Sequence, residues 1–387
     1  MSTVNEKCGK IDEAIEAFGI KGRLLTKQPY GNGYINDTFL LTYQLPNGER
    51  KRYILQRMNH SIFKKPEELM ENVAGVTEYL RQVIVKQGGN PDRETLNVIK
   101  TRNGKNYYTD SMGNFWRMFL FIEQTICLEQ VKSPEDFYDS AVAFGNFQRM
   151  LAEYPAQTLH ETIPDFHNTV VRFQNLKKAI KEDRMGRVDL AQKEIAFALE
   201  REKDTSVLTD LLREGKLPLR VTHNDTKLNN ILFDAETKKA LCIIDLDTVM
   251  PGLSHYDFGD SIRFGASTGA EDERDLDKVE LDLSLFEAFA KGYLEGCSGS
   301  LTDKEIEMLP MGAKLMTYEC GIRFLTDYLE GDVYFKVHRE GHNLDRTRTQ
   351  FKLVADMEKK WVKMSAIINA CGSRDADFRL ANPSKGL

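Results

Sequence analysis

The most constraining feature of this chain is a short polar loop that leads directly into two apolar runs. The loop covers residues 223–230 and reads HNDTKLNN, and the apolar runs are Ile231–Phe233 and Ala240–Ile244. Short apolar runs bounded by turn residues are typical of strands, so we expect a hairpin whose turn is Asp234–Lys239. A hairpin of this length brings Asp245, which follows the second run, back beside the end of the loop.

The spacing of the polar residues in this stretch indicates phosphoryl transfer. His223, Asp225 and Asn230 fit the kinase pattern H-x-D-x-x-x-x-N, in which the Asp acts on the acceptor hydroxyl and the Asn binds a metal ion. Asp245 offers a second metal ligand, and Lys227 lies two residues after Asp225. Each residue alone is more often part of a turn that bonds its own backbone. The complete pattern favours catalysis by Asp225 and Lys227, with Asn230 and Asp245 as Mg²⁺ ligands.

Composition limits the class of protein. A chain of 387 residues is long for one core and predicts two lobes. The formal net charge of -6 argues against a general nucleic-acid binder, which needs a basic surface. The six cysteines form no C-x-x-C pair, so we expect reduced thiols in a cytoplasmic protein. We expect neither a signal peptide nor a membrane partner, because no apolar run approaches the length of a membrane span.

The first third of the chain carries mainly strand signals. After a short amphipathic helix over 10–20, alternating apolar residues predict strands within 22–60 and within 96–121. Asn47-Gly48 between two such runs is a strong hairpin signal. Pro66, followed by two acidic residues, begins a predicted helix that separates the two groups of strands.

From Ser133 onward the sequence pattern predicts mainly helices. Ser133 is an N-cap residue and Pro134 occupies the first helical position. We expect helices over 134–152, 168–184, 188–214, 275–295, 303–329 and 345–370. The sequence therefore predicts an α+β, protein-kinase-like fold with two lobes. A small β-rich nucleotide-binding lobe covers residues 1–122, and a larger helical lobe with the catalytic loop and acceptor site covers residues 123–387.

A glycine turn indicates where the nucleotide binds in the first lobe. Gly31 and Gly33 can bring backbone N–H groups close to phosphates, although such a turn alone is more often an ordinary hairpin. Gln56 stands where a kinase strand carries the lysine that holds the α- and β-phosphates. The sequence leaves open which group replaces that charge. Ile122 and Glu123 end the last strand of the lobe and are expected at the hinge whose backbone reads adenine.

Longer strings extend the pattern beyond the loop. They are RVTHNDTKLNNIL over 220–232, IDLDT over 244–248, DFGDSIRFGAST over 257–268, ECGIRF over 319–324, YLEGDVY over 328–334 and RTRTQ over 346–350. On these strings the chain resembles the aminoglycoside phosphotransferase and choline kinase superfamily, and within it the N-acetylhexosamine 1-kinases of bacteria. The resemblance runs from about Tyr30 to the last helix.

This resemblance implies an activity and a set of roles. It implies transfer of the ATP γ-phosphoryl group to the anomeric C1 hydroxyl of an N-acetylhexosamine, N-acetylglucosamine or N-acetylgalactosamine. Asp225 is then the base that orients the acceptor hydroxyl. Asn230 and Asp245 are then the Mg²⁺ ligands.

The resemblance also implies a sugar site in the helical lobe. Arg323 and Tyr334 are its expected sugar-binding residues, and Phe264 is its expected apolar wall. Family members often have His at the sugar side of the glycine turn, where this chain has Tyr34. The preferred hexose therefore stays open.

Two other functions remain compatible with the sequence. The first is a kinase of another small molecule, such as an aminoglycoside, choline or another hexose. A cationic acceptor favours an acidic lid, and residues 270–282 are acidic, although such a run is more often a solvated helix start. The second is a kinase fold that binds nucleotide without catalysis, against which the intact Asp225, Asn230 and Asp245 argue. The oligomeric state cannot be read from the sequence.

Overall fold

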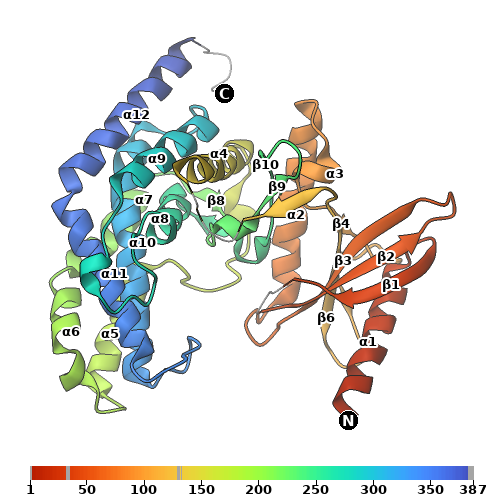
Figure 1. Cartoon of the computed structure of the whole chain (residues 1–387), viewed down its shortest axis with the longest axis horizontal. Helices are drawn as coiled ribbons and strands as arrows, with labels where there is room; N and C mark the ends of the chain where they lie inside the picture. The colour runs from red at the N-terminus through yellow and green to blue at the C-terminus, as the bar shows by residue number, and fades with distance from the viewer. Residues whose placement is uncertain (1, 32–34, 129–130, 132, 382–387) are drawn as a thin grey trace. The chain divides into compact units, whose positions relative to one another are not determined.

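The computed structural model describes residues 2–31, 35–128, 131 and 133–381, and the chain divides into two compact units. Unit 1 consists of Met1–Ile126, Thr158–Ile163 and Leu232–Met250, and unit 2 of Cys127–Gln157, Pro164–Ile231 and Pro251–Leu387. The sequence suggests one boundary after residue 122, whereas two later segments also cluster with unit 1. Strands predominate in the N-terminal part and helices in the C-terminal part, which confirms the predicted α+β class (Figure 1).

Unit 1 is built around an antiparallel sheet. Its strand order is β1-β2-β3-β6-β4, and β5 also pairs with β6. The strands are β1 (Arg23–Pro29), β2 (Asp37–Gln44), β3 (Arg50–Met58), β4 (Val98–Ile99), β5 (Tyr108–Thr109) and β6 (Phe115–Leu120). The predicted Asn47-Gly48 turn joins β2 to β3, and Gly48 adopts the positive φ of 85° that glycine tolerates best.

The two faces of this sheet differ in character. Leu41, Leu55 and Met118 on one face form a buried core with apolar residues of α1 (Ser2–Phe18). Because side chains alternate along a strand, Gln56 and Arg117 lie on the other face. Unit 1 also contains α2 (Pro66–Lys86), α3 (Pro91–Glu94) and a small sheet of order β10-β9-β7, whose strands are β7 (Thr125–Cys127), β9 (Ile231–Asp234) and β10 (Ala240–Ile243). The last two are the predicted hairpin.

Unit 2 is helical, and α10 (Asp303–Glu330) lies at its centre. This helix begins with the predicted capping box of Thr302 and Glu305 and ends at Gly331, whose φ is 104°. It packs against α5, α8, α11 and α12. The helices of unit 2 are α4 (Pro134–Met150), α5 (Thr169–Glu182), α6 (Gln192–Leu199), α7 (Val207–Arg213), α8 (Ser254–Gly265), α9 (Leu283–Cys297), α10, α11 (His342–Lys359) and α12 (Trp361–Ala381).

Three of the helices expected from the sequence are divided or shortened. The prediction of a single helix over 188–214 is wrong, because a 3₁₀ turn separates α6 from α7. In this turn Thr205 Oγ1 donates to the Glu202 carbonyl at 2.6 Å, and this bond competes with α-helical hydrogen bonding. The helix expected from residue 275 begins at Leu283, since the Asp282 side chain caps it by accepting from Ser284 N at 2.8 Å. The helix over 345–370 is two helices, α11 and α12.

Across the part of the chain that is described, none of the helices combines the length and the apolar character that a membrane crossing requires.

Candidate active site

The predicted catalytic loop, residues 223–230, is anchored by a buried carboxylate on α8. Two backbone N–H groups of the loop donate to Asp257: His223 N at 3.0 Å and Asn224 N at 2.8 Å. Gln148 Nε2 of α4 adds a third donor at 2.8 Å. Burial raises the pKa of the Asp257 carboxyl, although the charge of His223 and these donors act in the opposite direction. Three N–H groups converging on one side chain fix the start of the loop.

A second set of contacts fixes the loop on the far side of its Asp. Thr226 N donates to Asp260 Oδ2 at 3.2 Å, and Thr226 Oγ1 donates to the Asp257 carbonyl at 2.8 Å. Ser261 Oγ donates to the Thr226 carbonyl at 3.0 Å. Asp225 therefore lies between anchored neighbours, with its own side chain half-buried rather than enclosed. The sequence pattern did not assign any role to Asp257 or Asp260, because their contacts with the loop join segments that are distant in sequence.

The structure brings three predicted residues into direct contact. Lys227 Nζ lies 2.6 Å from Asp225 Oδ1, and Asn230 Nδ2 donates to the Asp225 carbonyl at 2.8 Å and to its Oδ2 at 3.2 Å. Burial lowers the pKa of Lys227, but the charge of Asp225 and the hydrogen bond to it raise that pKa overall. Asp225 therefore has a protonated amine on one oxygen and an amide on the other.

Asp245 occupies a backbone conformation that is uncommon for residues other than glycine. Asn230 directly precedes β9, and Asp245 comes two residues after β10. Asp245 has φ 60° and ψ 56°, in the left-handed region, and its side chain is exposed. Such backbone strain in residues other than glycine is concentrated at functional sites. An amide and a carboxylate are also ligand types that hold Mg²⁺ together with nucleotide phosphates, so each residue taken by itself has the chemistry predicted for it.

The predicted sugar-binding residues Arg323 and Tyr334 lie together in unit 2. The Arg323 guanidinium carbon is 5.6 Å from the centre of the Phe166 ring, 5.9 Å from that of Tyr334 and 5.5 Å from that of Phe335. Within the described residues, Arg323 forms no hydrogen bond or ion pair with another side chain or with the backbone. Its N–H groups are therefore held by aromatic rings rather than by a carboxylate. Phe264, the predicted apolar wall, is 45% exposed near the end of α8.

A histidine that the sequence did not single out lies near Arg323. His167 Nδ1 is 2.8 Å from Glu319 Oε1, and the His167 ring packs against Phe166 and Tyr256 at centre distances of 4.5 and 5.2 Å. Its other nitrogen, Nε2, is buried and has no hydrogen-bond partner within the described residues. Burial raises the pKa of Glu319, but His167 and Arg323 lower it overall. A charged, fully buried acid thus holds a ring whose second nitrogen is buried and makes no hydrogen bond within the described residues.

The predicted nucleotide-binding residues of unit 1 fall into two groups. Gly31 has φ 74° and open space around its Cα, as a turn that approaches phosphates requires, whereas Gly33 and Tyr34 lie outside the described residues. At the predicted hinge, the Ile122 carbonyl accepts from Thr125 Oγ1 at 3.1 Å, and the Glu123 carbonyl accepts from Arg93 Nη2 at 3.2 Å. An adenine contact at these two residues would therefore use their N–H groups.

Gln56 is tied to both neighbouring strands. Its Nε2 donates to Thr38 Oγ1 of β2 at 3.0 Å, and its Oε1 accepts from Arg117 Nε of β6 at 2.9 Å. The neutral side chain at the position of the kinase lysine is thus in direct contact with a cation.

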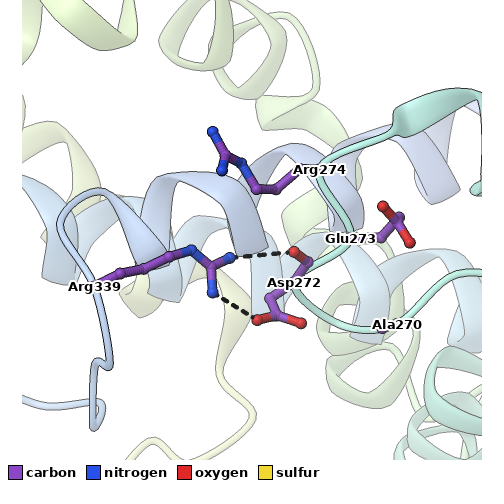
Figure 2. A pocket seen from close by; sticks show the side chains of 5 residues that line it. All are labelled: Ala270, Asp272, Glu273, Arg274 and Arg339. Atoms are coloured by element: carbon purple, nitrogen blue, oxygen red, sulfur yellow. Dashed lines mark hydrogen bonds and ion pairs between the residues drawn. The ribbon is translucent and has the colours of Figure 1, made fainter.

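Several acids of the segment 270–282 pair with cations of the same unit, and the segment precedes α9 rather than starting it. Arg339 lies 3.0 Å from Asp272, and His342 Nε2 lies 2.9 Å from the same carboxylate. Figure 2 shows Arg339 reaching Asp272 across a surface hollow of about 380 Å³. The hollow is lined by Ala270, Asp272, Glu273, Arg274 and Arg339.

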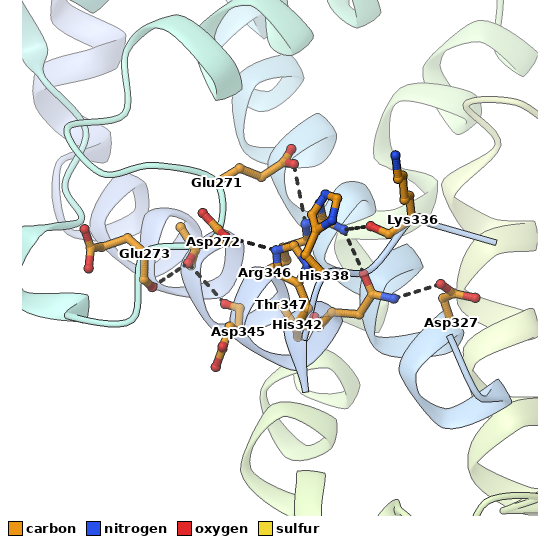
Figure 3. A network of polar contacts seen from close by, with 12 residues as sticks. Glu271, Asp272, Glu273, Asp327, Lys336, His338, His342, Asp345, Arg346 and Thr347 are labelled. Carbon is orange, nitrogen blue, oxygen red and sulfur yellow. Dashed lines mark hydrogen bonds and ion pairs between the residues drawn. The ribbon is translucent and has the colours of Figure 1, made fainter. Parts of the chain in front are cut away.

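The same network continues toward α8 and α11. Glu271 lies 3.8 Å from Arg346 (Figure 3). Glu271 also lies 3.0 Å from Arg263, and Asp345 lies 3.1 Å from Arg339. These carboxylates are already neutralised by arginines. Within the described residues Glu273, Asp277 and Asp282 form no ion pair, so the segment is neutralised only in part.

Comparison with known proteins identifies the family and the fold. The phosphotransferase enzyme family, APH, matches residues 26–294. The microcompartment-associated aminopropanol kinase is 14% identical with a TM-score of 0.57, covering 92% of this chain and 98% of that chain. Choline kinase from Cryptosporidium parvum Iowa II is 14% identical with a TM-score of 0.53, covering 87% and 90%. Amicoumacin kinase hAmiN, solved with AMP-PNP, Ca²⁺ and Ami, is 12% identical with a TM-score of 0.51, covering 87% and 91%. These three structures share the fold. Because the family match spans more than half of the chain, the protein belongs to the phosphotransferase enzyme family.

Proposed function

We propose that this phosphotransferase is an ATP-dependent N-acetylhexosamine 1-kinase. It transfers the γ-phosphoryl group of ATP to the anomeric C1 hydroxyl of N-acetylglucosamine or N-acetylgalactosamine and releases ADP and the sugar 1-phosphate. The strings shared with the bacterial N-acetylhexosamine 1-kinases support the choice of C1. The observation that carries the acceptor class is the unpaired guanidinium of Arg323 among three aromatic rings.

An arginine without a carboxylate partner favours ligands that accept hydrogen bonds and carry no positive charge. Its N–H groups donate and cannot accept, so they suit the hydroxyl and amide oxygens of an acetylated sugar. Tyr334, which is 69% exposed, adds a hydroxyl to the same place, and an aromatic ring such as Phe264 can pack on the C–H face of a pyranose. A cationic acceptor gains nothing from Arg323 and is repelled by it. The pairing of Glu271 and Asp272 with arginines lowers the negative charge available to a cationic acceptor.

The loop supplies the groups for the chemical step. The acceptor oxygen attacks the γ-phosphorus, the bond from that phosphorus to the β,γ-bridging oxygen breaks, and the acceptor proton passes to or through Asp225. Lys227, held as a cation beside Asp225, lies where it can offset charge on the transferred group. Mg²⁺ on Asn230 and Asp245 would neutralise the phosphates.

The nucleotide is proposed to bind unit 1. The amicoumacin kinase that shares this fold was solved with AMP-PNP, which supports an adenine nucleotide as the donor. The turn of Gly31 and Gly33 would cover the phosphates, and Ile122 and Glu123 would contact adenine through their N–H groups. Tyr34 in the same turn would tune which hexose is preferred.

A panel of acceptors tests the proposal. ADP release is measured with pure protein, ATP and Mg²⁺ in the presence of N-acetylhexosamines, other hexoses, choline and aminoglycosides. We expect turnover with the N-acetylhexosamines, and a strong loss of kcat/KM for them in Arg323→Ala. Lys193, an exposed cation on α6 in the same unit, provides a matched control in Lys193→Ala. Phosphorylation of aminoglycosides or choline without any sugar would overturn the acceptor assignment.

A further inference from the structure

The strand position that holds a lysine in kinases is neutral in this chain, yet a buried cation lies directly beside it. Arg117 of β6 is the cross-strand partner of Gln56 in the antiparallel pairing of β3 with β6. Directly opposed residues have Cβ atoms about 5 Å apart, so their side chains can reach the same ligand atoms. Arg117 Nε donates to Gln56 Oε1 at 2.9 Å, which places the guanidinium beside the end of the Gln56 side chain.

The row that contains Arg117 lies at the end of the sheet next to the glycine turn. Thr38, Gln56 and Arg117 are register partners across β2, β3 and β6, and Thr38 is the second residue of β2, which follows the turn. All three lie on the face that α1 does not cover. Phe119, two residues along β6, extends this face, since its ring centre is 5.2 Å from the Arg117 guanidinium carbon.

Arg117 is also connected to the segment that carries Asp245. It forms an ion pair with Asp247, which in turn accepts from Asn36 Nδ2 at 2.8 Å. The Asn36 side chain accepts from Asn59 N at 3.0 Å. A single network in unit 1, in which Arg117 and Asp247 are buried and Asn36 is half-buried, therefore joins the sheet, the residue before β2 and the 3₁₀ turn Leu246–Thr248 that follows the candidate metal ligand.

The hydrogen bonding of Arg117 is incomplete. A guanidinium has five N–H donors, and among the described residues Arg117 uses Nε for Gln56 and Nη1 for Asp247. The residue is only 2% exposed, and a buried arginine is costly unless its remaining donors find acceptors. One N–H of Nη1 and both N–H groups of Nη2 remain, and phosphate oxygens match the planar guanidinium well.

We propose that Arg117 replaces the missing strand lysine and binds the α- and β-phosphates of the nucleotide, with Asp247 as the carboxylate that holds it in place. The proposal rests on the proposed use of ATP. It places the phosphate-binding charge one strand away from its usual position, with Gln56 as a neutral neighbour that orients the guanidinium.

Nucleotide binding without turnover tests this proposal on the intact chain. Dissociation constants for ADP and for adenosine are measured by calorimetry on the wild type and on Arg117→Gln. Losing charge-assisted hydrogen bonds should weaken ADP binding by about 10- to 100-fold. Adenosine, which has no phosphates, should change less than about 2-fold. Arg57→Gln is the control. Arg57 follows Gln56 on β3 and lies on the opposite face of the same sheet, so this variant also loses one arginine but should keep the ADP dissociation constant near the wild-type value.

A charge swap separates phosphate binding from a purely structural ion pair. Gln56→Lys combined with Arg117→Gln returns one cation to the same row and should recover ADP affinity to within about 5-fold of the wild type. If Arg117→Gln alone does not fold, the ADP and adenosine constants of this double variant still test the proposal. Unchanged ADP affinity in Arg117→Gln, an equal loss for ADP and adenosine, or a folded swap variant that binds adenosine but not ADP would each overturn the proposal. Because wild-type sugar turnover is measured separately, these outcomes are distinct from a failure of the proposed function.

Discussion

Replacing Asp257 by Asn tests how strongly α8 fixes the catalytic loop. The carboxylate accepts three N–H groups: His223 N and Gln148 Nε2 on Oδ2, and Asn224 N on Oδ1. An amide has only one oxygen, so its best orientation keeps the two bonds at Oδ2 and turns its NH₂ group toward Asn224 N. One buried donor then loses its acceptor, which costs about 1–3 kcal/mol of folding free energy.

The kinetic effect should exceed the effect on substrate binding. Asn224 precedes Asp225, and a displacement of about 1 Å at a catalytic group can lower turnover about 100-fold. We therefore expect kcat of Asp257→Asn to fall about 10- to 100-fold while the ATP dissociation constant stays near the wild-type value. Gln148→Met removes one donor to Asp257 together with the bond to the Val221 carbonyl, and it leaves the Asp257 carboxylate intact, so its kcat should fall less. Urea unfolding, steady-state kinetics and ATP calorimetry give the three quantities. Wild-type kcat in a folded Asp257→Asn variant would refute the reasoning.

Other consequences of the site can be tested in the same preparation. Lys227→Ala should lower kcat more than ATP affinity, because its charge is placed for the transferred group; equal kcat would make it a surface lysine. Activity should require Mg²⁺, with Asp245→Ala more damaging than Asn230→Ala, since a charged ligand is lost; full activity in excess chelator contradicts this. Burial raises the pKa of Glu319, but His167, Arg323 and Thr169 lower it overall. The ionised carboxylate therefore stabilises the fold fully at a pH above the ordinary carboxyl pKa. This stabilisation is lost as the pH falls through the lowered pKa of Glu319 in the folded protein. Urea midpoints from pH 7 to pH 3 should therefore fall more steeply for the wild type than for Glu319→Gln, and parallel curves would exclude this role.

Local signals in the sequence predicted the elements that carry the site. The Ser133-Pro134 helix start, the capping box of Thr302 and Glu305 and the Asn47-Gly48 turn each involve residues close in sequence, and all appear in the structure. The spacing of Asp225, Lys227 and Asn230 likewise describes one short loop, whose residues are in contact.

Long-range contacts could not be predicted in this way. Asp257 is separated from His223 by a hairpin, and His167 from Glu319 by most of unit 2, so no periodicity relates them. The contact between Gln56 and Arg117 depends on the register of two strands that are not consecutive in the chain. The sequence pattern identified the absence of the strand lysine, but only the sheet order identifies the neighbouring cation.

The most direct test of the central claim is the position of the new phosphate on the sugar. N-acetylglucosamine is incubated with ATP, Mg²⁺ and pure protein, and the product is analysed by proton and phosphorus NMR. The account predicts a phosphate coupled to the anomeric proton, and Asp225→Asn should form it about 10²- to 10⁴-fold more slowly. Coupling to the C6 protons, or no sugar phosphate while another acceptor is phosphorylated, would contradict the account.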